Sequence, residues 1–385
     1  MSLRNTHASS FARYAPRRCV PAIAIGLLSQ ALMLPLAAAQ SVADVVDLPI
    51  VYAVSVAPGA GATLDEARTA FLVRSVDAEE LDRLQVMDIT DALNRRVVGL
   101  SLNTVQGNPF QPDLQYRGFT GSPLLGTPQG LAVYQDGVRV NEVFGDTVNW
   151  DLLPVAALER VEVIAGANPV FGLNTLGGAI SLTSKDGFSA PGTAARYEAG
   201  SFGRRQAGLE SGGNNERFGY YVYTDDLRED GWRELSPSRA RHAFASFGWR
   251  GDKTTLDLIL AHANTRLTGN GAAPVELLAE DRGAIFTAPD ETDNRLDQAT
   301  LRGTHAFADD ALLSASVSSR RVRTHAYNGD GSDAEECEAE DSILCEDDGD
   351  QAILGQSGQP VSSEFDAINN IGTRRQRAQG GNVQF

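Results

Sequence analysis

The chain has 385 residues and a formal net charge of −17. This length allows two or three domains. The acidic balance argues against nucleic acid as a partner, because nucleic-acid-binding proteins gather Lys and Arg on one face. Beyond the N-terminus, no apolar run approaches the ~20 residues that a membrane-spanning helix needs. Transmembrane strands remain compatible with this sequence, because their apolar residues alternate with polar ones and escape a hydropathy scan.

Residues 1–39 have the pattern of a secretory signal sequence. Residues 20–36 are mostly apolar, and three alanines at 37–39 offer a cleavage site. The positive charge ahead of this run comes from Arg4, Arg13, Arg17 and Arg18. A membrane anchor and a twin-arginine export route are the alternatives. Prolines within the apolar run disfavour the anchor, and the residues around the arginine pair fit the export route poorly.

An alternating apolar segment, Ile50–Val56, follows and is closed by Pro58-Gly59. It is either the first strand of the next domain or a segment that a partner protein binds by adding a strand. Strand addition needs an extended segment with free backbone donors and acceptors. The segment consists of Ile50, Val51, Tyr52, Ala53, Val54, Ser55 and Val56.

Two short helices are predicted next. Asp77-x-x-Glu80 is a capping-box pattern that opens a helix through Leu84. Asp88 is predicted to cap a second helix, whose end Gly99 marks. One apolar face of this second helix carries Ile89, Ala92, Leu93 and Val97.

From Leu114 to Lys185 the sequence has the pattern of short strands separated by turns that need glycine. LAVYQ and VRVN flank Asp136-Gly137, which favours a tight hairpin with positive φ angles. Residues 160–164 and 178–184 alternate apolar and polar side chains, which predicts two half-buried strands. Sharp turns or close backbone packing are predicted at six glycines: Gly118, Gly137, Gly166, Gly172, Gly177 and Gly178. These elements indicate a compact α+β domain.

This succession resembles the plug domain of TonB-dependent outer-membrane receptors. Five motifs carry the resemblance in the family's order, which makes the signal specific. They are Tyr116-Arg117-Gly118, Asp136-Gly137, Glu159–Gly166, Phe171-Gly172 (where the family usually has tyrosine) and Gly177–Lys185. The resemblance implies a signal peptide at 1–39, an N-terminal extension at 40–59, a plug domain at 60–185 and a partial transmembrane β-barrel with extracellular loops at 186–385.

The resemblance also implies roles for single residues. Ile50–Val56 becomes the candidate TonB box, the segment that the energising protein TonB binds. Arg117, Arg160 and Glu162 match plug residues that form ion pairs with each other and with carboxylates of the barrel wall. The alternative is that these three are ordinary solvated strand charges. The loops at 107–112 and 118–130 are expected to face the ligand.

After Lys185 the pattern changes to segments of about 10 residues with period-two alternation, which is typical of a transmembrane barrel. Eight such strands are predicted, with GYYVYTDDL at 219–227 paired to HAFASFGWR at 242–250. Short turns alternate with long connections near 228–240, 268–294 and 328–372. A soluble β-sandwich is the alternative from alternation alone. An aromatic girdle at the membrane interface is predicted from Tyr220, Tyr221, Tyr223, Phe247 and Trp249.

Eight strands cannot close a barrel around a plug, because plugged transporters need about 22 strands. The expected fold class is therefore an α+β plug domain followed by an incomplete antiparallel transmembrane β-barrel. We expect Phe385 to lie inside a longer reading frame.

The stretch 330–350 carries eleven Asp or Glu and no Lys or Arg. A solvated external loop is the expected interpretation, and cation binding is the alternative, without regular ligand spacing to support it. Cys337 and Cys345 lie inside this stretch, and removal of the signal peptide leaves them as the remaining cysteines. In an exported protein such a pair predicts a disulfide.

The sequence contains no nucleophile elbow, phosphate loop or metal-ligand pattern, so no enzyme activity, resident metal or cofactor is predicted. The resemblance implies an outer-membrane receptor of a Gram-negative bacterium that takes up a scarce solute, foremost a ferric siderophore or other metal chelate. The implied partners are TonB, outer-membrane lipid and a small extracellular ligand. The alternatives are a saccharide or cobalamin receptor of the same family, or a non-transporting adhesion or docking protein.

Overall fold

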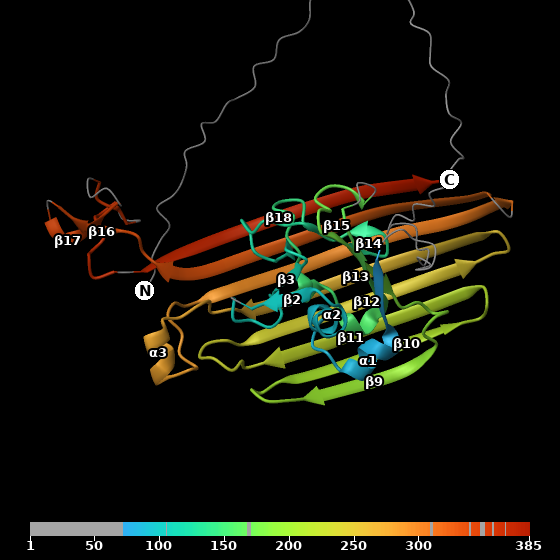
Figure 1. The fold of residues 1–385 in the computed structure, drawn as a ribbon, viewed down its shortest axis with the longest axis horizontal. Coiled ribbons are helices and arrows are strands. Elements are labelled where there is room, and N and C mark those ends of the chain that lie inside the picture. Colours follow the sequence, from blue (N-terminus) through green and yellow to red (C-terminus); the bar gives the residue numbers. More distant parts are fainter. Residues whose placement is uncertain are drawn as a thin grey trace, which may run out of the picture. The chain divides into compact units, whose positions relative to one another are not determined.

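The computed structural model describes residues 72–104, 106–167, 171–308, 311–338, 340–346, 351–355, 358–365 and 367–385. The predicted signal peptide and the candidate TonB box lie outside these residues. A small mixed domain, called the plug here, is followed by a large antiparallel sheet, called the wall sheet (Figure 1). Within the described part of the chain, no helix is long and apolar enough to span a membrane.

Both predicted plug helices form, and both begin at the predicted caps. Asp77 precedes α1 (Ala78–Leu84), and its side chain accepts a hydrogen bond from the Glu80 amide at 2.9 Å. Asp88 precedes α2 (Ile89–Arg96) and accepts from the amides of Thr90 and Asp91. Each cap satisfies amide donors that have no partner within the helix and contributes about 1 kcal/mol.

The plug contains two sheets. The larger has the strand order β1-β7-β8-β5-β6, in which only the pair β5 and β8 is parallel. Its strands are β1 (Val73–Asp77), β5 (Leu131–Gln135), β6 (Val138–Arg139), β7 (Leu158–Ala165) and β8 (Gly178–Ser184). The smaller sheet consists of β2 (Leu100–Asn103), β3 (Asp113–Tyr116) and β4 (Phe119–Gly121). The predicted hairpin between β5 and β6 is confirmed, with φ of 50° at Asp136 and 83° at Gly137.

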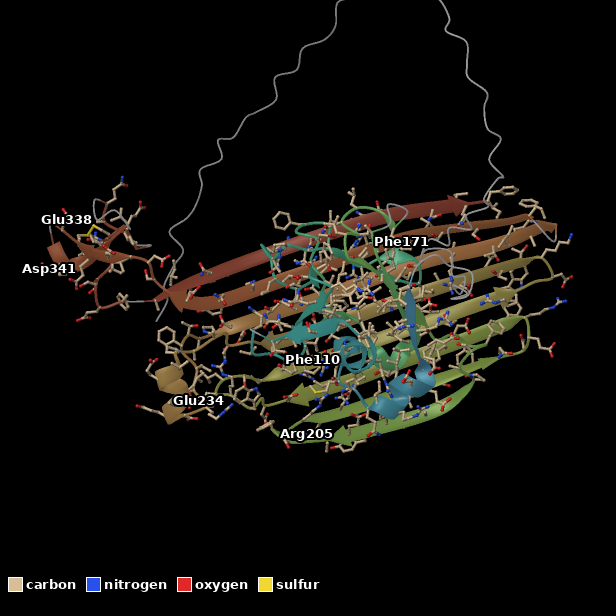
Figure 2. All side chains as sticks on the ribbon, viewed as in Figure 1. Phe110, Phe171, Arg205, Glu234, Glu338 and Asp341 are labelled. Carbon is tan, nitrogen blue, oxygen red and sulfur yellow. A yellow bond between two sulfur atoms is a disulfide. The ribbon has the colours of Figure 1, made fainter. Side chains whose placement is uncertain are left out.

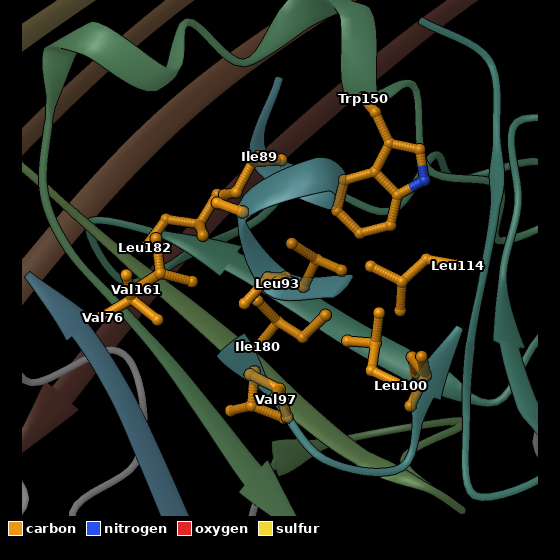
Figure 3. Close-up of a cluster of buried hydrophobic side chains, with 14 of the residues drawn as sticks. Val76, Ile89, Leu93, Val97, Leu100, Leu114, Trp150, Val161, Ile180 and Leu182 are labelled. Atoms are coloured by element: carbon orange, nitrogen blue, oxygen red, sulfur yellow. The ribbon is translucent and has the colours of Figure 1, made fainter. Parts of the chain in front are cut away.

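The apolar face of α2 packs on the larger plug sheet. Ile89 and Leu93 are completely buried, and they lie against Ile180, Leu182 and Trp150 in one apolar cluster (Figure 3). The indole Nε1 of Trp150 donates to the carbonyl of Gly121 at 3.2 Å, so its one polar atom is satisfied. Fully burying an isoleucine or leucine side chain contributes about 1.5–3 kcal/mol, so this cluster stabilises the plug.

The prediction that the strands at 160–164 and 178–184 are half-buried is wrong. Six of the seven residues of β8 are buried, and Glu162 on β7 is only 5% exposed. The first face of the sheet meets α2. A second apolar cluster covers the other face: Val73, Ala132, Ile164, Phe171 and Ala179. Alternation therefore marked the strands correctly but did not show that both faces are covered.

The wall sheet has eight antiparallel strands in the order β18-β15-β14-β13-β12-β11-β10-β9, as the strand count predicted (Figure 1). The strands are β9 (Gly192–Ala199), β10 (Arg205–Asn214), β11 (Phe218–Glu229), β12 (Ser238–Arg250), β13 (Thr254–Thr268), β14 (Asp290–Ala308), β15 (Ala311–Gly331) and β18 (Ala367–Gln384). The predicted pairing of β11 with β12 is confirmed. The sheet is open, with β9 and β18 at its edges. The predicted length of about 10 residues is too short, since β14 has 19 residues and β15 has 21.

The long connections of the wall sheet all leave it at one end, which we call the loop end. One contains α3 (Val275–Glu280), and another contains the hairpin of β16 (Glu335–Cys337) and β17 (Glu340–Cys345). Cys337 and Cys345 are joined by a disulfide across this hairpin, with an S–S distance of 2.03 Å. Figure 2 labels Glu338 and Asp341, two of the acidic residues that this hairpin carries.

We expect Cys337 and Cys345 to be oxidised to each other in protein isolated from cells. Closing a loop this short removes chain entropy equivalent to about 2–3 kcal/mol, which should order the acidic hairpin. Alkylation without reductant, followed by mass spectrometry, should find no label on Cys337 or Cys345, and alkylation after reduction should label both. Two labelled thiols before reduction would contradict the prediction.

The two faces of the wall sheet differ in what they contact. Tyr221 and Tyr223 on β11 are 1% and 7% exposed and belong to an apolar cluster with Ala157 of the plug. Their predicted place in an outer aromatic girdle is therefore wrong, because they occupy the phase of β11 that faces the plug. Tyr220 and Phe247 are 44% and 46% exposed and lie on the opposite, outer face.

Candidate functional site at the plug–wall interface

The plug contacts the inner face of the wall sheet through apolar clusters and buried polar pairs. Leu152 of the plug packs with Ala263, Leu296 and Val322 of the wall. Phe110 forms a similar cluster with Leu227, Ala240 and Leu267. These contacts bury surface, and the polar pairs between them determine the orientation of the plug.

The first polar pair joins Glu142 of the plug to Arg320 on β15. The Arg320 Nη2 donates to Glu142 Oε1 at 3.0 Å, and the two side chains are only 4% and 3% exposed. Asn149 donates to the same carboxylate oxygen at 3.2 Å, and Arg320 Nη1 donates to Gln298 at 2.9 Å. The ion pair is thus buried and at hydrogen-bond distance. A neutral side chain also hydrogen-bonds to each partner: Asn149 to Glu142, and Gln298 to Arg320.

The second polar group is Asp151, which follows Trp150 in the 3-10 helix Trp150–Leu152. Its carboxylate Oδ2 accepts from Thr265 Oγ1 at 2.5 Å and from Asn294 Nδ2 at 3.1 Å. Its carbonyl oxygen lies 2.8 Å from Nε2 of His242, whose Nδ1 lies 2.8 Å from the Asp225 carboxylate. One plug residue therefore contacts three wall strands, β12, β13 and β14.

Burial raises the pKa of the Asp151 carboxyl above its usual value, and the hydrogen bonds from Thr265 and Asn294 offset part of this increase. The second carboxylate oxygen, Oδ1, has no hydrogen-bond partner among the described residues. An ionised group with a buried unpaired oxygen is held at a cost in free energy. Burial with one oxygen unpaired therefore favours the protonated form of Asp151 in the docked plug.

The third group is a chain of charges that begins at Asp136 in the β5–β6 turn. Its Oδ1 accepts from the Ser184 amide at 3.0 Å and lies 4.0 Å from Arg302 Nη1 on β14. Arg302 Nε donates to Asp257 at 3.2 Å, and Asp257 accepts from Arg250 at 2.6 Å. Burial raises the pKa of Asp136, and Arg302 counteracts the increase.

In all three groups the plug supplies the carboxylate. In the two ion pairs, Glu142–Arg320 and Asp136–Arg302, the wall supplies the arginine. Lys185 of the plug, paired with Glu210 at 3.1 Å, has the opposite polarity. The resemblance implied plug cations opposite wall carboxylates; among the described residues, Lys185–Glu210 has that polarity, and the Glu142–Arg320 and Asp136–Arg302 pairs have the reverse one.

The predicted ion-pair residues are only partly brought together. Arg160 Nε lies 3.4 Å from Glu162 Oε1, so these two form a pair within the plug. Arg117 makes no ion pair with any described residue, and its predicted pairing stays a prediction: its side chain is exposed, and its guanidinium carbon lies 5.3 Å from the centre of the Tyr116 ring. The reason is the turn at Arg117-Gly118, where both residues have positive φ and the strand reverses toward β4.

The turn glycines lie where the backbone needs them. Gly118, Gly137, Gly166, Gly172 and Gly178 all have positive φ. Gly177 does not, but a Cβ there would lie 2.5 Å from Cβ of Phe119. That distance is shorter than real Cβ contacts, so the small residue at 177 allows close packing.

Glu142, Asp151 and Arg320 were missed from the sequence. A weak signal was present, since Arg302 and Arg320 share the strand phase of the buried residues Leu296 and Val322. Charged residues at strand positions that otherwise carry buried apolar side chains indicate buried partners.

Asn108 of the 107–112 stretch donates to Ser238 Oγ and to the Thr268 carbonyl, which places this stretch at the loop end of the wall. No cluster of metal-ligating side chains occurs among the described residues.

Comparisons with known proteins agree with this architecture. Residues 65–179 match the family model for the TonB-dependent receptor plug domain. A ferric aerobactin receptor of Klebsiella pneumoniae is 28% identical over 160 residues, covering 38% of this chain and 19% of that receptor. The vitamin B12 transporter BtuB of Vibrio vulnificus is 24% identical over 176 residues, covering 44% of this chain and 27% of the transporter.

Among solved structures, the open form of the ferric-catecholate import receptor Fiu of Escherichia coli matches 81% of this chain with a TM-score of 0.56 and 18% identity. The match covers 45% of that receptor, so this chain spans less than half of its length, and the likeness concerns the fold. The family model identifies the plug domain, and the wall sheet on which the plug docks has the fold of such receptors. Residues 65–179 are a plug domain of the TonB-dependent receptor type, and the chain is similar in sequence and fold to TonB-dependent receptors.

Proposed function

We propose that the protein is an outer-membrane receptor that takes up a ferric siderophore or related metal chelate in a TonB-dependent way. The observation that carries the proposal is a plug domain docked on the inner face of the wall sheet through buried, specific polar pairs. A ferric aerobactin receptor and a ferric-catecholate import receptor are among the similar proteins, which supports iron chelates as the cargo.

The outer face of the wall sheet supports the membrane location. The register aligns one row of apolar side chains across five strands: Tyr220, Phe247, Leu258, Leu301 and Val317. Each of these side chains is 39–57% exposed, whereas Asp257, next to Leu258 on the other face, is 6% exposed. An exposed apolar row beside a polar inner face is the reverse of a soluble sheet and matches a barrel wall.

The plug–wall interface suggests how the plug stays docked at rest and how a pulling force displaces it. Removing one partner of a buried ion pair costs about 3–5 kcal/mol, so the docked plug resists random displacement. The same pairs are few and polar, and the charges exposed by displacement are solvated again. A pull on the N-terminal segment Ile50–Val56 by TonB, energised at the inner membrane, is the proposed release step.

The test of energisation is a proline at Val54. Proline removes the amide donor and blocks strand addition, so Val54→Pro should abolish uptake of radiolabelled ferric chelate while leaving its binding to cells unchanged. Val54→Thr is the matched control, because it keeps the amide and the β-branched shape, and its uptake should remain normal. Normal uptake by Val54→Pro would place the TonB contact elsewhere.

The cargo is tested by growth of a deletion strain on a panel of iron sources, with and without the intact gene. Aerobactin, catecholate and citrate chelates are the first members of the panel, with vitamin B12 as the alternative cargo. Growth rescued by one iron chelate supports the proposal. No rescue by any iron source, together with a vitamin B12 defect, would overturn the iron assignment.

A further inference from the structure

A belt of arginines crosses the outer face of the wall sheet at its loop end. The pairing register places Asp226, Arg241, Asn264, Arg295, Arg323 and Arg375 side by side on six successive strands. All six alternate with side chains that face the plug, so they stand on the same outer face as the apolar row of Tyr220. The rows on either side of this row add further arginines: Arg228, Arg239, Arg266, Arg321 and Arg377.

The arginines of the belt outnumber their acidic partners. Asp226 alone contacts Arg228, Arg239 and Arg241, at 2.8, 3.1 and 2.5 Å. Asp293 pairs with Arg266 at 2.7 Å, and Asp297 lies 3.8 Å from Arg295. The next outward carboxylate, Glu291, lies two positions further toward the loops on β14.

Four arginines of the belt form no ion pair with any described residue, although Asp297 on β14 lies opposite Arg321 in the register. Arg321 and Arg323 on β15 pair across the sheet with Arg377 and Arg375 on β18, and all four side chains are exposed. Like charges directly opposite each other on neighbouring strands destabilise a sheet unless something binds between them. Arg323 and Arg375 also line a groove of about 590 Å³ together with Arg239, Arg241 and Arg266. This charge stands out in a chain of net charge −17.

The belt lies where the apolar band ends. On β11, Phe218 is exposed near the turn end and Asp226 is in the belt, eight positions further along the strand. Eight residues span about 26 Å along a strand, or about 20 Å of height at the usual tilt, close to the ~25 Å of a barrel's apolar band. The arginines therefore stand at the height of the lipid headgroups on the loop side.

We propose that this belt binds the phosphate groups of phosphorylated lipid headgroups in the leaflet on the loop side of the membrane. The planar guanidinium donates two parallel hydrogen bonds to phosphate oxygens, and rows of arginines on neighbouring strands match a headgroup that bears more than one phosphate. The continuous apolar rows below the belt supply the surface for the acyl chains of the same lipid. This inference rests on the outer-membrane location proposed above.

The test compares two double variants of equal charge. Arg323→Gln/Arg375→Gln removes two unpaired arginines of the belt. Arg217→Gln/Arg282→Gln is the control, because both residues are exposed, lie outside the belt and have no ion pair among the described residues. Purified receptor in detergent is titrated with diphosphorylated lipid A, with its dephosphorylated form and with inorganic phosphate, and retained lipid is counted by native mass spectrometry.

We expect lipid A to bind the parent and the control equally, and the belt variant about tenfold more weakly. Dephosphorylated lipid should bind weakly to all three proteins, and added salt should weaken the binding of lipid A. Equal affinity of the belt variant and the control would overturn the proposal. Inorganic phosphate competing at the same concentration as lipid A would assign the belt to free anions instead and would also overturn it.

The outcome is separable from the test of uptake. The belt residues lie on the outer face, away from the plug contacts, and the variant loses two like charges that face each other, so it should be at least as resistant to thermal unfolding as the parent in lipid-free detergent. If Val54→Pro leaves uptake normal, the proposed release step fails while the lipid titration still stands. If lipid A binding is independent of the belt arginines, the lipid site fails while uptake is unaffected.

Discussion

Replacing Glu142 with leucine should lower the free energy of unfolding by about 3–5 kcal/mol, because Arg320 is then left buried without its carboxylate. Both side chains are almost inaccessible to solvent, at 4% and 3% exposure, so water cannot replace the lost partner. Arg320→Met alone should have a similar effect for the same reason. The measurement is urea-induced unfolding in detergent, followed by tryptophan fluorescence, in which Trp150 reports the plug core.

The double variant Glu142→Leu/Arg320→Met should recover most of the loss, since an apolar pair of similar volume needs no desolvation of charge. Glu79→Leu is the exposed control: Glu79 and Arg83 form a pair whose side chains are 85% and 62% exposed, and its loss should cost less than about 1 kcal/mol. A double variant as unstable as the single ones would show that Glu142 and Arg320 act through separate contacts and not as a pair.

Replacing Asp151 with alanine should also be strongly destabilising. Thr265 and Asn294 lose their shared acceptor inside the interface, and each buried donor left unpaired costs about 1–3 kcal/mol. Asp151→Asn keeps an acceptor oxygen for both donors and removes only the charge. We therefore expect the asparagine variant to unfold at higher urea concentration than the alanine variant at every pH.

The same residue should make stability depend on pH. Burial raises the pKa of Asp151 in the folded protein, so the folded state holds the proton more tightly than the unfolded chain does. The contribution of the protonated Asp151 carboxyl to the free energy of unfolding is complete below the unfolded pKa near 3.8. It is lost as the pH rises through the raised pKa of the folded state. His242 and Asp225 also face this site, and both remain in Asp151→Asn, so the difference between the two proteins reports the carboxyl together with its interaction with His242.

The unfolding free energy of the parent, minus that of Asp151→Asn, should therefore fall as the pH rises above the unfolded pKa near 3.8 and level off above the raised pKa of the folded state. Urea titrations of both proteins at several pH values provide the measurement. A difference that rises with pH would mean that the ionised form is favoured in the interface, contrary to the burial of its unpaired oxygen.

The sequence by itself determined the elements whose causes are local. Asp77 and Asp88 lie just ahead of the two helices, and their carboxylates accept hydrogen bonds from amides of the first helical turn. All residues of such a cap lie within four positions of the sequence. Asp136-Gly137 supplies the two positive φ angles of its hairpin. Period-two alternation predicted the eight wall strands and the pairing of β11 with β12, because side-chain direction alternates along any strand.

Only the tertiary structure decided which face of each strand meets the plug and which charges meet each other. Alternation separates Tyr220 from Tyr221, but it assigns neither side chain to the plug or to the outer face until the sheet is docked. Glu142 and Arg320 are 178 positions apart, and the rows of the arginine belt join six strands. Strand register and docking bring such groups together, and burial then strengthens their interaction by lowering the local dielectric constant.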